Sequence, residues 1–287
     1  MSNPAISNNP AFSGKTLSAD ELRRIYDQPS AETNRPGVDK AATSAAAVAA
    51  ANRMSGRGVP TEFGSAEPMT YSNTISKTAF LFMLVVLGAA VGWWMPALMI
   101  PGAIVGLVLG LINAFKKEPS PALIIGYSAA QGLFLGGISG LYNGMYPGIV
   151  SQAVIGTLAV FGVTLLLFRS GKVRTSPKMT KIFLVGIVGY LVFSVVNLVL
   201  MFTGVVTDPW GLRTGVEIFG IPLGVIIGVF AVLLAAYSLV MDFEFIKNGV
   251  ENRVPEKWGW SAAFGLMVTL IWLYLEILRI LAILRGD

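Results

Sequence analysis

Residues 258–284 read WGWSAAFGLMVTLIWLYLEILRILAIL, and this stretch decides the fold class. It exceeds the roughly 20 apolar residues that a helix needs to cross the hydrocarbon core of a bilayer. Its only charged residues are Glu276 and Arg279. A continuous apolar run without alternation favours a membrane-spanning helix over a strand of a membrane barrel.

Six further apolar runs precede this one, so the sequence predicts an all-α, polytopic membrane protein with seven transmembrane helices. The seven runs cover approximately residues 77–95, 97–115, 121–142, 148–168, 181–203, 218–242 and 258–284. Only 13% of the 287 residues are charged and the mean hydropathy is +0.68. A soluble domain has about a quarter of its residues charged. Glycines four residues apart recur in three runs, which favours close helix packing.

The residue types that are missing narrow the function. The chain contains no Cys and no His, which excludes disulfides, Cys/His zinc sites and Ser-His catalysis. It also lacks a phosphate-binding glycine loop followed by Lys and Ser or Thr. We therefore expect neither an enzyme nor a bound cofactor.

The N-terminal residues differ from the rest of the chain. Residues 1–76 are rich in Ala, Ser, Asn, Pro and Gly and contain no long apolar run. Such a segment buries too little apolar surface to offset the entropy of ordering. We expect a disordered tail before a membrane domain at residues 77–287, with docking to a partner protein as the alternative. The first apolar stretch begins near Ala79, too far along the chain for a signal peptide.

Basic residues are distributed unevenly between the two sides of the expected bundle. The tail and alternate connections hold 18 Lys and Arg residues, whereas the other side holds one, Arg213. Cytoplasmic loops carry an excess of Lys and Arg. We therefore expect a cytoplasmic N-terminus and an outside C-terminus. Topology also accounts for the net charge of +5 without nucleic-acid binding.

Two acidic residues in the apolar runs need an explanation. Asp242 ends the sixth run, and Glu276 lies deep in the seventh. A charge at the middle of a membrane helix costs about 2.5–3.5 kcal/mol on insertion scales, so it should face the bundle and have a partner. Helical spacing puts both acids on small-residue faces, whereas Glu244 points away from the face of Asp242.

Three hypotheses compete for Glu276. It could form a structural ion pair with Arg279, one turn further along the helix. It could share a proton or a hydrogen bond with Asp242 in a titrating latch. It could also line a cation path, and the last two hypotheses can be one mechanism. Without histidine, carboxylates would have to supply any response to pH near neutrality.

Residues 241–284 resemble the end of the Bax inhibitor motif (YccA-like) family. That family has Asp near the end of its sixth helix, in many members followed two positions later by Gln. It also has Leu-Tyr-Leu-Asp within its last helix. The corresponding positions here are Asp242, Glu244 and the Leu-Tyr-Leu-Glu of residues 273–276.

Two further segments look like the bacterial branch of this family, residues 69–93 and 131–138, and this resemblance implies a location in the cell inner membrane. The resemblance covers about residues 69–284 and leaves out the tail. It implies seven helices with the last one central and six around it. It also implies a pH-sensitive calcium leak that is gated by a pair of inward carboxylates.

Carried over by position, this pair is Asp242 and Glu276, with Arg279 and Glu244 as supporting residues. Carboxylate oxygens suit Ca²⁺, which takes oxygen ligands. In this hypothesis Ca²⁺ is the transported ion and not a bound cofactor. If helix six ended near residue 249 and helix seven began near residue 256, the two acids would differ in depth by about 20 Å. The connection must then fold back for them to meet.

The leading hypothesis is therefore a membrane protein that leaks Ca²⁺ or another cation, including H⁺, under the control of carboxylate protonation. A non-conducting protein that binds other membrane proteins and regulates stress survival or membrane quality control is the alternative. A third hypothesis is a small-molecule or proton-coupled transporter. A water-accessible cavity that reaches Glu276 favours the first and third hypotheses, and a solid core with a closed Glu276–Arg279 pair favours the second.

Overall fold

The computed structural model describes residues 67–206 and 210–286. Within these ranges seven helices are long and apolar enough to cross a membrane, as the sequence predicts. The chain is therefore a multi-pass membrane protein. The helices are α4 (Tyr71–Trp94), α5 (Met99–Phe115), α6 (Pro121–Met145), α7 (Ile149–Arg169), α8 (Pro177–Phe202), α9 (Leu223–Glu251) and α10 (Trp258–Gly286).

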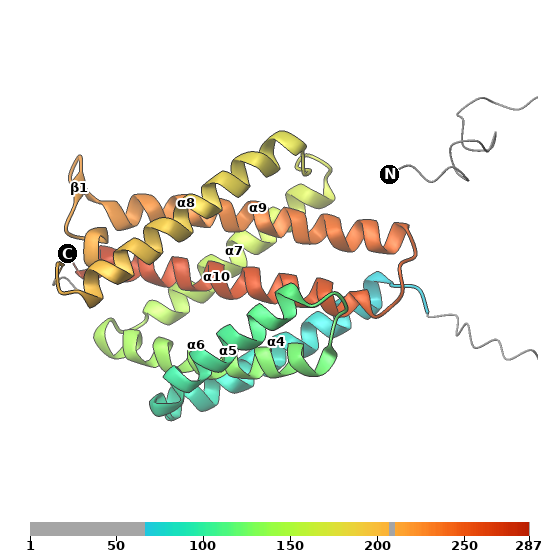
Figure 1. Cartoon of the computed structure of the whole chain (residues 1–287), viewed down its shortest axis with the longest axis horizontal. Helices are drawn as coiled ribbons and strands as arrows, with labels where there is room; N and C mark the ends of the chain where they lie inside the picture. The colour runs from blue at the N-terminus through green and yellow to red at the C-terminus, as the bar shows by residue number, and fades with distance from the viewer. Residues whose placement is uncertain (1–66, 207–209, 287) are drawn as a thin grey trace, which may run out of the picture. The chain divides into compact units, whose positions relative to one another are not determined.

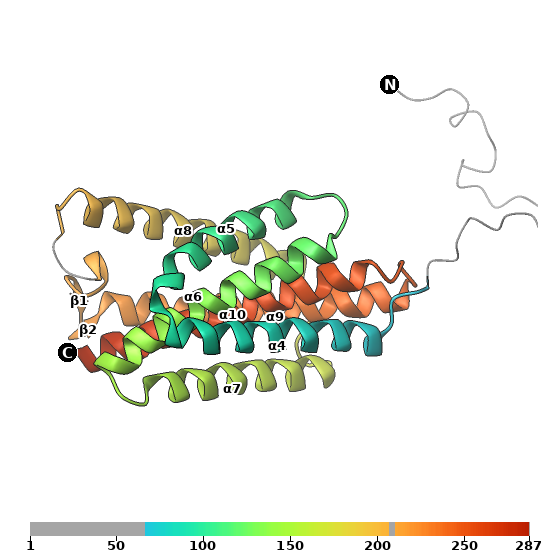
Figure 2. The same cartoon turned by 90° about the horizontal axis from the view of Figure 1, so that it is seen from below.

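The last helix is central, as the family resemblance implies. Helix α10 packs against α4, α6, α7 and α9, and the bundle surrounds it in both views (Figures 1 and 2). It also contributes to all three buried hydrophobic clusters, for example through Met267, Leu273 and Leu278. The start of α4 and the end of α10 lie at opposite ends of the bundle, as expected for an odd number of spans (Figure 1).

The first helix begins earlier than its apolar run. Residues 1–66 of the expected tail lie outside the described residues, but α4 starts at Tyr71 rather than at residue 77. Thr70 is the N-cap, and its hydroxyl accepts a hydrogen bond of 3.1 Å from the amide of Asn73. A polar cap and first turn extend the helix beyond its apolar part, where hydropathy gives no signal.

The sixth helix is displaced along the chain relative to the predicted 218–242. Residues 217–222 instead form a small antiparallel hairpin, β1 (Glu217–Ile218) and β2 (Ile221–Pro222). Gly220 lies in its turn with a φ of 76°, a conformation that favours glycine. Helix α9 then begins at Leu223 and continues to Glu251, so Asp242 lies inside the helix rather than at its end.

The glycine runs bring α6 close to its neighbours. A Cβ on Gly132 would lie 2.6 Å from the carbonyl oxygen of Val85 in α4. A Cβ on Gly102 of α5 would lie 2.8 Å from the carbonyl oxygen of Ala130. The backbones can therefore approach only because these positions lack side chains, which is how small residues act at membrane helix interfaces.

Polar contacts join three segments at the end of the bundle where α4 starts. Lys77 pairs with Glu256 at 3.0 Å, and Lys257 pairs with Glu118 at 2.9 Å. The hydrogen bond from Lys77 is the main cause that holds the pKa of Glu256 below its ordinary value, with a further bond from Asn73. These contacts connect α4 and the α5–α6 loop to the short α9–α10 connection.

Candidate functional site around Glu276

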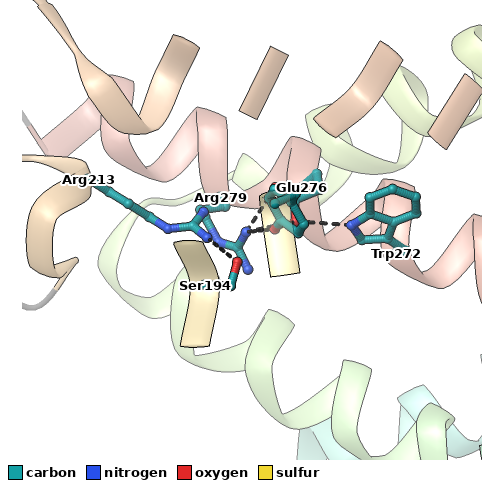
Figure 3. Close-up of polar contacts among 6 residues, drawn as sticks. Ser194, Arg213, Trp272, Glu276 and Arg279 are labelled. Carbon is teal, nitrogen blue, oxygen red and sulfur yellow. Dashed lines mark hydrogen bonds and ion pairs between the residues drawn. The ribbon is translucent and has the colours of Figure 1, made fainter. Parts of the chain in front are cut away.

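Glu276 is almost completely buried in α10, with 1% of its surface exposed. Nη1 of Arg279, one turn along the same helix, lies 2.7 and 2.8 Å from the two carboxylate oxygens (Figure 3). The i,i+3 spacing brings the two side chains together on one helix face. The ion pair, one of the three hypotheses for Glu276, is therefore present in the structure.

Two further side chains complete the surroundings of this carboxylate. The Tyr190 hydroxyl on α8 donates to Oε1 of Glu276 and accepts a 3.0 Å hydrogen bond from Arg279. The indole of Trp272 donates to the same oxygen at 3.2 Å (Figure 3). Every partner is a donor, so the arrangement satisfies an ionised carboxylate.

The second acid, Asp242, lies elsewhere along α10. Its Oδ2 accepts a hydrogen bond of 2.7 Å from the hydroxyl of Thr269, which also contacts Ser238 at 3.2 Å. Its Oδ1 lies against Gly265, where a Cβ would approach to 2.9 Å. Asp242 thus faces α10 and the small residues of that helix, as its position on the helix predicts.

The structure does not bring the two acids into direct contact. Asp242 meets α10 at Thr269, seven residues before Glu276, which corresponds to about 10 Å along a helix. The expected shared proton or hydrogen bond between them is therefore wrong for this conformation. The cause is unequal spacing from the turn between the two helices. Only nine residues follow Asp242 before α9 ends at Glu251, whereas eighteen separate Glu276 from the start of α10 at Trp258. Among the described residues no group of three or more acidic side chains could hold a metal ion.

Glu244 points away from the face of Asp242, as predicted, but it is not free in the headgroup region. Its Oε2 accepts hydrogen bonds from the amide of Thr175 at 2.9 Å and from the hydroxyl of Thr175 at 2.7 Å. This carboxylate therefore fixes the α7–α8 connection against α9. It supports the fold and lies apart from Glu276.

A cavity of about 400 Å³ opens beside Glu276, between α8 and α10. Sequence reasoning missed two of its polar residues, Tyr190 and Arg213. Arg213 comes from η3 (Gly211–Arg213) in the α8–α9 connection and donates to the hydroxyl of Ser194 at 3.2 Å (Figure 3). The sequence did contain a hint of its role, because Arg213 is the one Lys or Arg in the connections on the side of the bundle that has few basic residues. The lining residues are Ile187, Tyr190, Leu191, Ser194, Arg213, Trp272, Leu275, Glu276 and Arg279.

Comparison with known proteins places the chain in a family. No curated protein matches the sequence. The family model described as Bax inhibitor 1 like matches residues 3–286. The match is longer than the resemblance over residues 69–284 indicated, because it also includes most of the tail, which has no apolar periodicity to reveal it. The chain therefore belongs to the Bax inhibitor 1 like family.

Proposed function

We propose that this protein is a pH-sensitive leak for Ca²⁺ or another cation, and that protonation of Glu276 controls it. The observation that carries the proposal is a buried carboxylate that borders a cavity between two helices of a membrane bundle. Ionisable residues inside a membrane domain are costly to keep and often mark ion or proton pathways.

The contacts of Glu276 suggest how protonation would act. Its ion pair with Arg279 lies within α10, so the pair alone cannot hold two helices together. Tyr190 provides the connection, because its hydroxyl reaches from α8 to both charged groups. A proton on Glu276 would remove the charge that attracts both donors. We infer that α8 then separates from α10 and widens the cavity.

Asp242 is proposed as a second station for the cation rather than as a partner of Glu276. Its carboxylate and the hydroxyls of Thr269 and Ser238 form a cluster of oxygen atoms, and oxygen is the ligand that Ca²⁺ requires. Tight protein sites give Ca²⁺ six to eight oxygen ligands, more than this cluster offers. Conduction needs sites that release the ion readily and are separated along a path.

Calcium flux into proteoliposomes across a pH series tests the proposal. The wild type should admit more Ca²⁺ as the pH falls, and Glu276→Gln should be insensitive to pH because Gln cannot ionise. Glu251→Gln is the matched control, since it removes the same charge from an exposed position on α9. Folded Glu276→Gln protein with the wild-type pH dependence would overturn the switch.

The closed ion pair also supports a second candidate function. A protein that conducts no ions and binds other membrane proteins would use the Glu276–Arg279 pair only for stability. In that case no variant at Glu276 or Arg279 would change ion flux, although both would be less stable. Parallel measurement of flux and stability distinguishes the two candidates.

The uneven distribution of Lys and Arg supports a cytoplasmic N-terminus and an outside C-terminus, and the proposed inner-membrane location rests on the resemblance to the bacterial branch. Reporter fusions after Asp287 should then report an outside location, and fusions near Gly64 should report an inside one. A cytoplasmic location for both ends would contradict this orientation.

A further inference from the structure

Arg213 is a buried cation without a described carboxylate partner. Only 5% of its surface is exposed, and its Nη1 has no hydrogen-bond partner among the described residues. Its other contacts are the Ser194 hydroxyl and the rings of Tyr190 and Phe193, whose centroids lie 5.8 and 5.6 Å from the guanidinium carbon. A buried guanidinium costs free energy unless an opposite charge and hydrogen bonds compensate it.

The charges of the described residues around the cavity do not cancel. Arg213 and Arg279 both line it, whereas Glu276 is the only acid that does so in the described part of the chain. Nη1 of Arg279 already donates hydrogen bonds to Glu276 and Tyr190. No hydrogen bond from its Nε or Nη2 joins it to a described residue. Two guanidinium groups therefore line one cavity beside a single described carboxylate, and each has N–H groups without a hydrogen-bond partner among the described residues.

The rest of the cavity wall is apolar. Ile187, Leu191, Trp272 and Leu275 form it, and Leu191 is exposed on the surface of α8. The volume of about 400 Å³ falls within the range of small-molecule sites, about 300–1,000 Å³. An anionic head with an apolar body would match both parts of this lining. Basic pockets between membrane helices bind lipid headgroups in the same way.

We propose that this cavity is a binding site for an oxyanion, a phosphate or carboxylate group, held between Arg213 and Arg279. Guanidinium groups bind such oxyanions through paired, charge-assisted hydrogen bonds. The anion would come either from a membrane lipid headgroup or from solution. The site does not depend on ion conduction, so its test is independent of the proposed leak.

Binding to the purified wild-type protein is the first test. Native mass spectrometry would compare phosphatidylglycerol with phosphatidylcholine, and thermal unfolding would be followed with added inorganic phosphate. Retention of the anionic lipid over the neutral one identifies a lipid source, and stabilisation by phosphate alone identifies a soluble source. A wild type that shows neither effect overturns the proposal.

Matched variants locate the binding. Arg213→Gln should weaken anion binding by about tenfold or more, because it removes charge-assisted hydrogen bonds. Arg213→Lys should weaken anion binding less than Arg213→Gln, since lysine keeps the positive charge but lacks the planar guanidinium that binds two oxygens at once. Arg285→Gln is the control, because it makes the same charge change at an exposed position of α10. Equal losses in Arg213→Gln and Arg285→Gln would reduce the effect to net charge and overturn the site.

A milder variant guards against a folding failure. Ser194→Ala keeps both arginines but removes the hydroxyl that Arg213 contacts, so it should weaken binding less than Arg213→Gln. An internal counterion is the rival explanation, and Asp208, five residues before Arg213, is the acid to test. It lies outside the described residues. If Asp208→Asn bound anions and the wild type did not, the proposal would be wrong.

Discussion

The interfaces of α6 and α8 are built in opposite ways. Helix α6 packs backbone against backbone on α4 and α5, and half of its most apolar window is buried inside the bundle. Helix α8 has only 6% of that window buried, and a cavity separates part of it from α10. Its contacts with α10 include the polar ones of Tyr190. The contrast indicates that the α4–α6 side is the rigid frame and α8 is the element that can move.

The largest expected effect concerns the charges beside α8. Arg279→Gln leaves Glu276 buried without its cation, and losing one partner of a buried pair costs about 3–5 kcal/mol. The free energy of unfolding in mixed micelles should fall by about 3 kcal/mol, the low end of that range, because Arg279 is partly exposed. Arg285→Gln should change it little. A loss no greater than that of Arg285→Gln would show that Glu276 does not depend on the pair.

The next largest effect is expected on the α4–α6 side, which forms the rigid frame. Gly132→Ala places a Cβ 2.6 Å from the Val85 carbonyl oxygen, and overpacking of this kind costs about 1–3 kcal/mol. Gly189→Ala on α8 is the matched control, since no atom lies within 4 Å of its Cβ position. It should be neutral or slightly stabilising, because alanine favours helices. Similar losses in the two variants would remove the contrast between α6 and α8.

A smaller effect is expected from the tyrosine that joins α8 to the ion pair. Tyr190→Phe removes one hydroxyl and should cost about 1.5 kcal/mol, with faster amide hydrogen exchange along α8. Tyr237→Phe is the control, because its hydroxyl also reaches α8, at 2.9 Å from Thr180, but contacts no charged group. If only Tyr237→Phe accelerated exchange in α8, Tyr190 would not be the connection.

The site also shows what a sequence can predict. The i,i+3 spacing of Glu276 and Arg279 on one helix was enough to offer their pair as one hypothesis, because local geometry brings the two side chains together. The meeting of Asp242 with Thr269 depends on where α9 ends and how the chain turns, and hydropathy locates neither. Tyr190 and Arg213 were missed for a similar reason. They reach the site from another helix and from a short 3₁₀ turn.

The fold shows the same difference between features that local sequence predicts and features that it does not. Apolar runs located all seven spans, whereas polar or turn-forming residues displaced several of their ends, and the displacement is largest in α4 and α9. Thr70 starts α4 early, and the turn at Gly220 delays α9. Boundaries of this kind depend on single capping and turn residues, which leave little trace in average hydropathy.

The smallest effect concerns the end of the bundle where α4 starts, far from α8. The pKa of Glu256 lies below its ordinary value of 4.5, chiefly because Lys77 donates to it. A depressed pKa in the folded state means that the contact stabilises fully above about pH 4.5 and is lost as the pH falls through the folded pKa. Glu256→Gln should flatten the decline of the melting temperature in acid. An unchanged acid profile would show that this contact contributes no measurable stability.

The most direct test of the central claim is the distance between α8 and α10 as a function of pH. The chain has no cysteine, so Val195→Cys and Leu284→Cys can carry spin labels without background, and both positions are exposed. If ionised Glu276 holds α8 against α10, the labels should show one short distance at alkaline pH and a longer, broader distribution in acid. Glu276→Gln should give the longer distribution at every pH. A distance that does not change with pH in the otherwise wild-type protein, or that still changes in Glu276→Gln, would contradict the claim that Glu276 holds α8 in place.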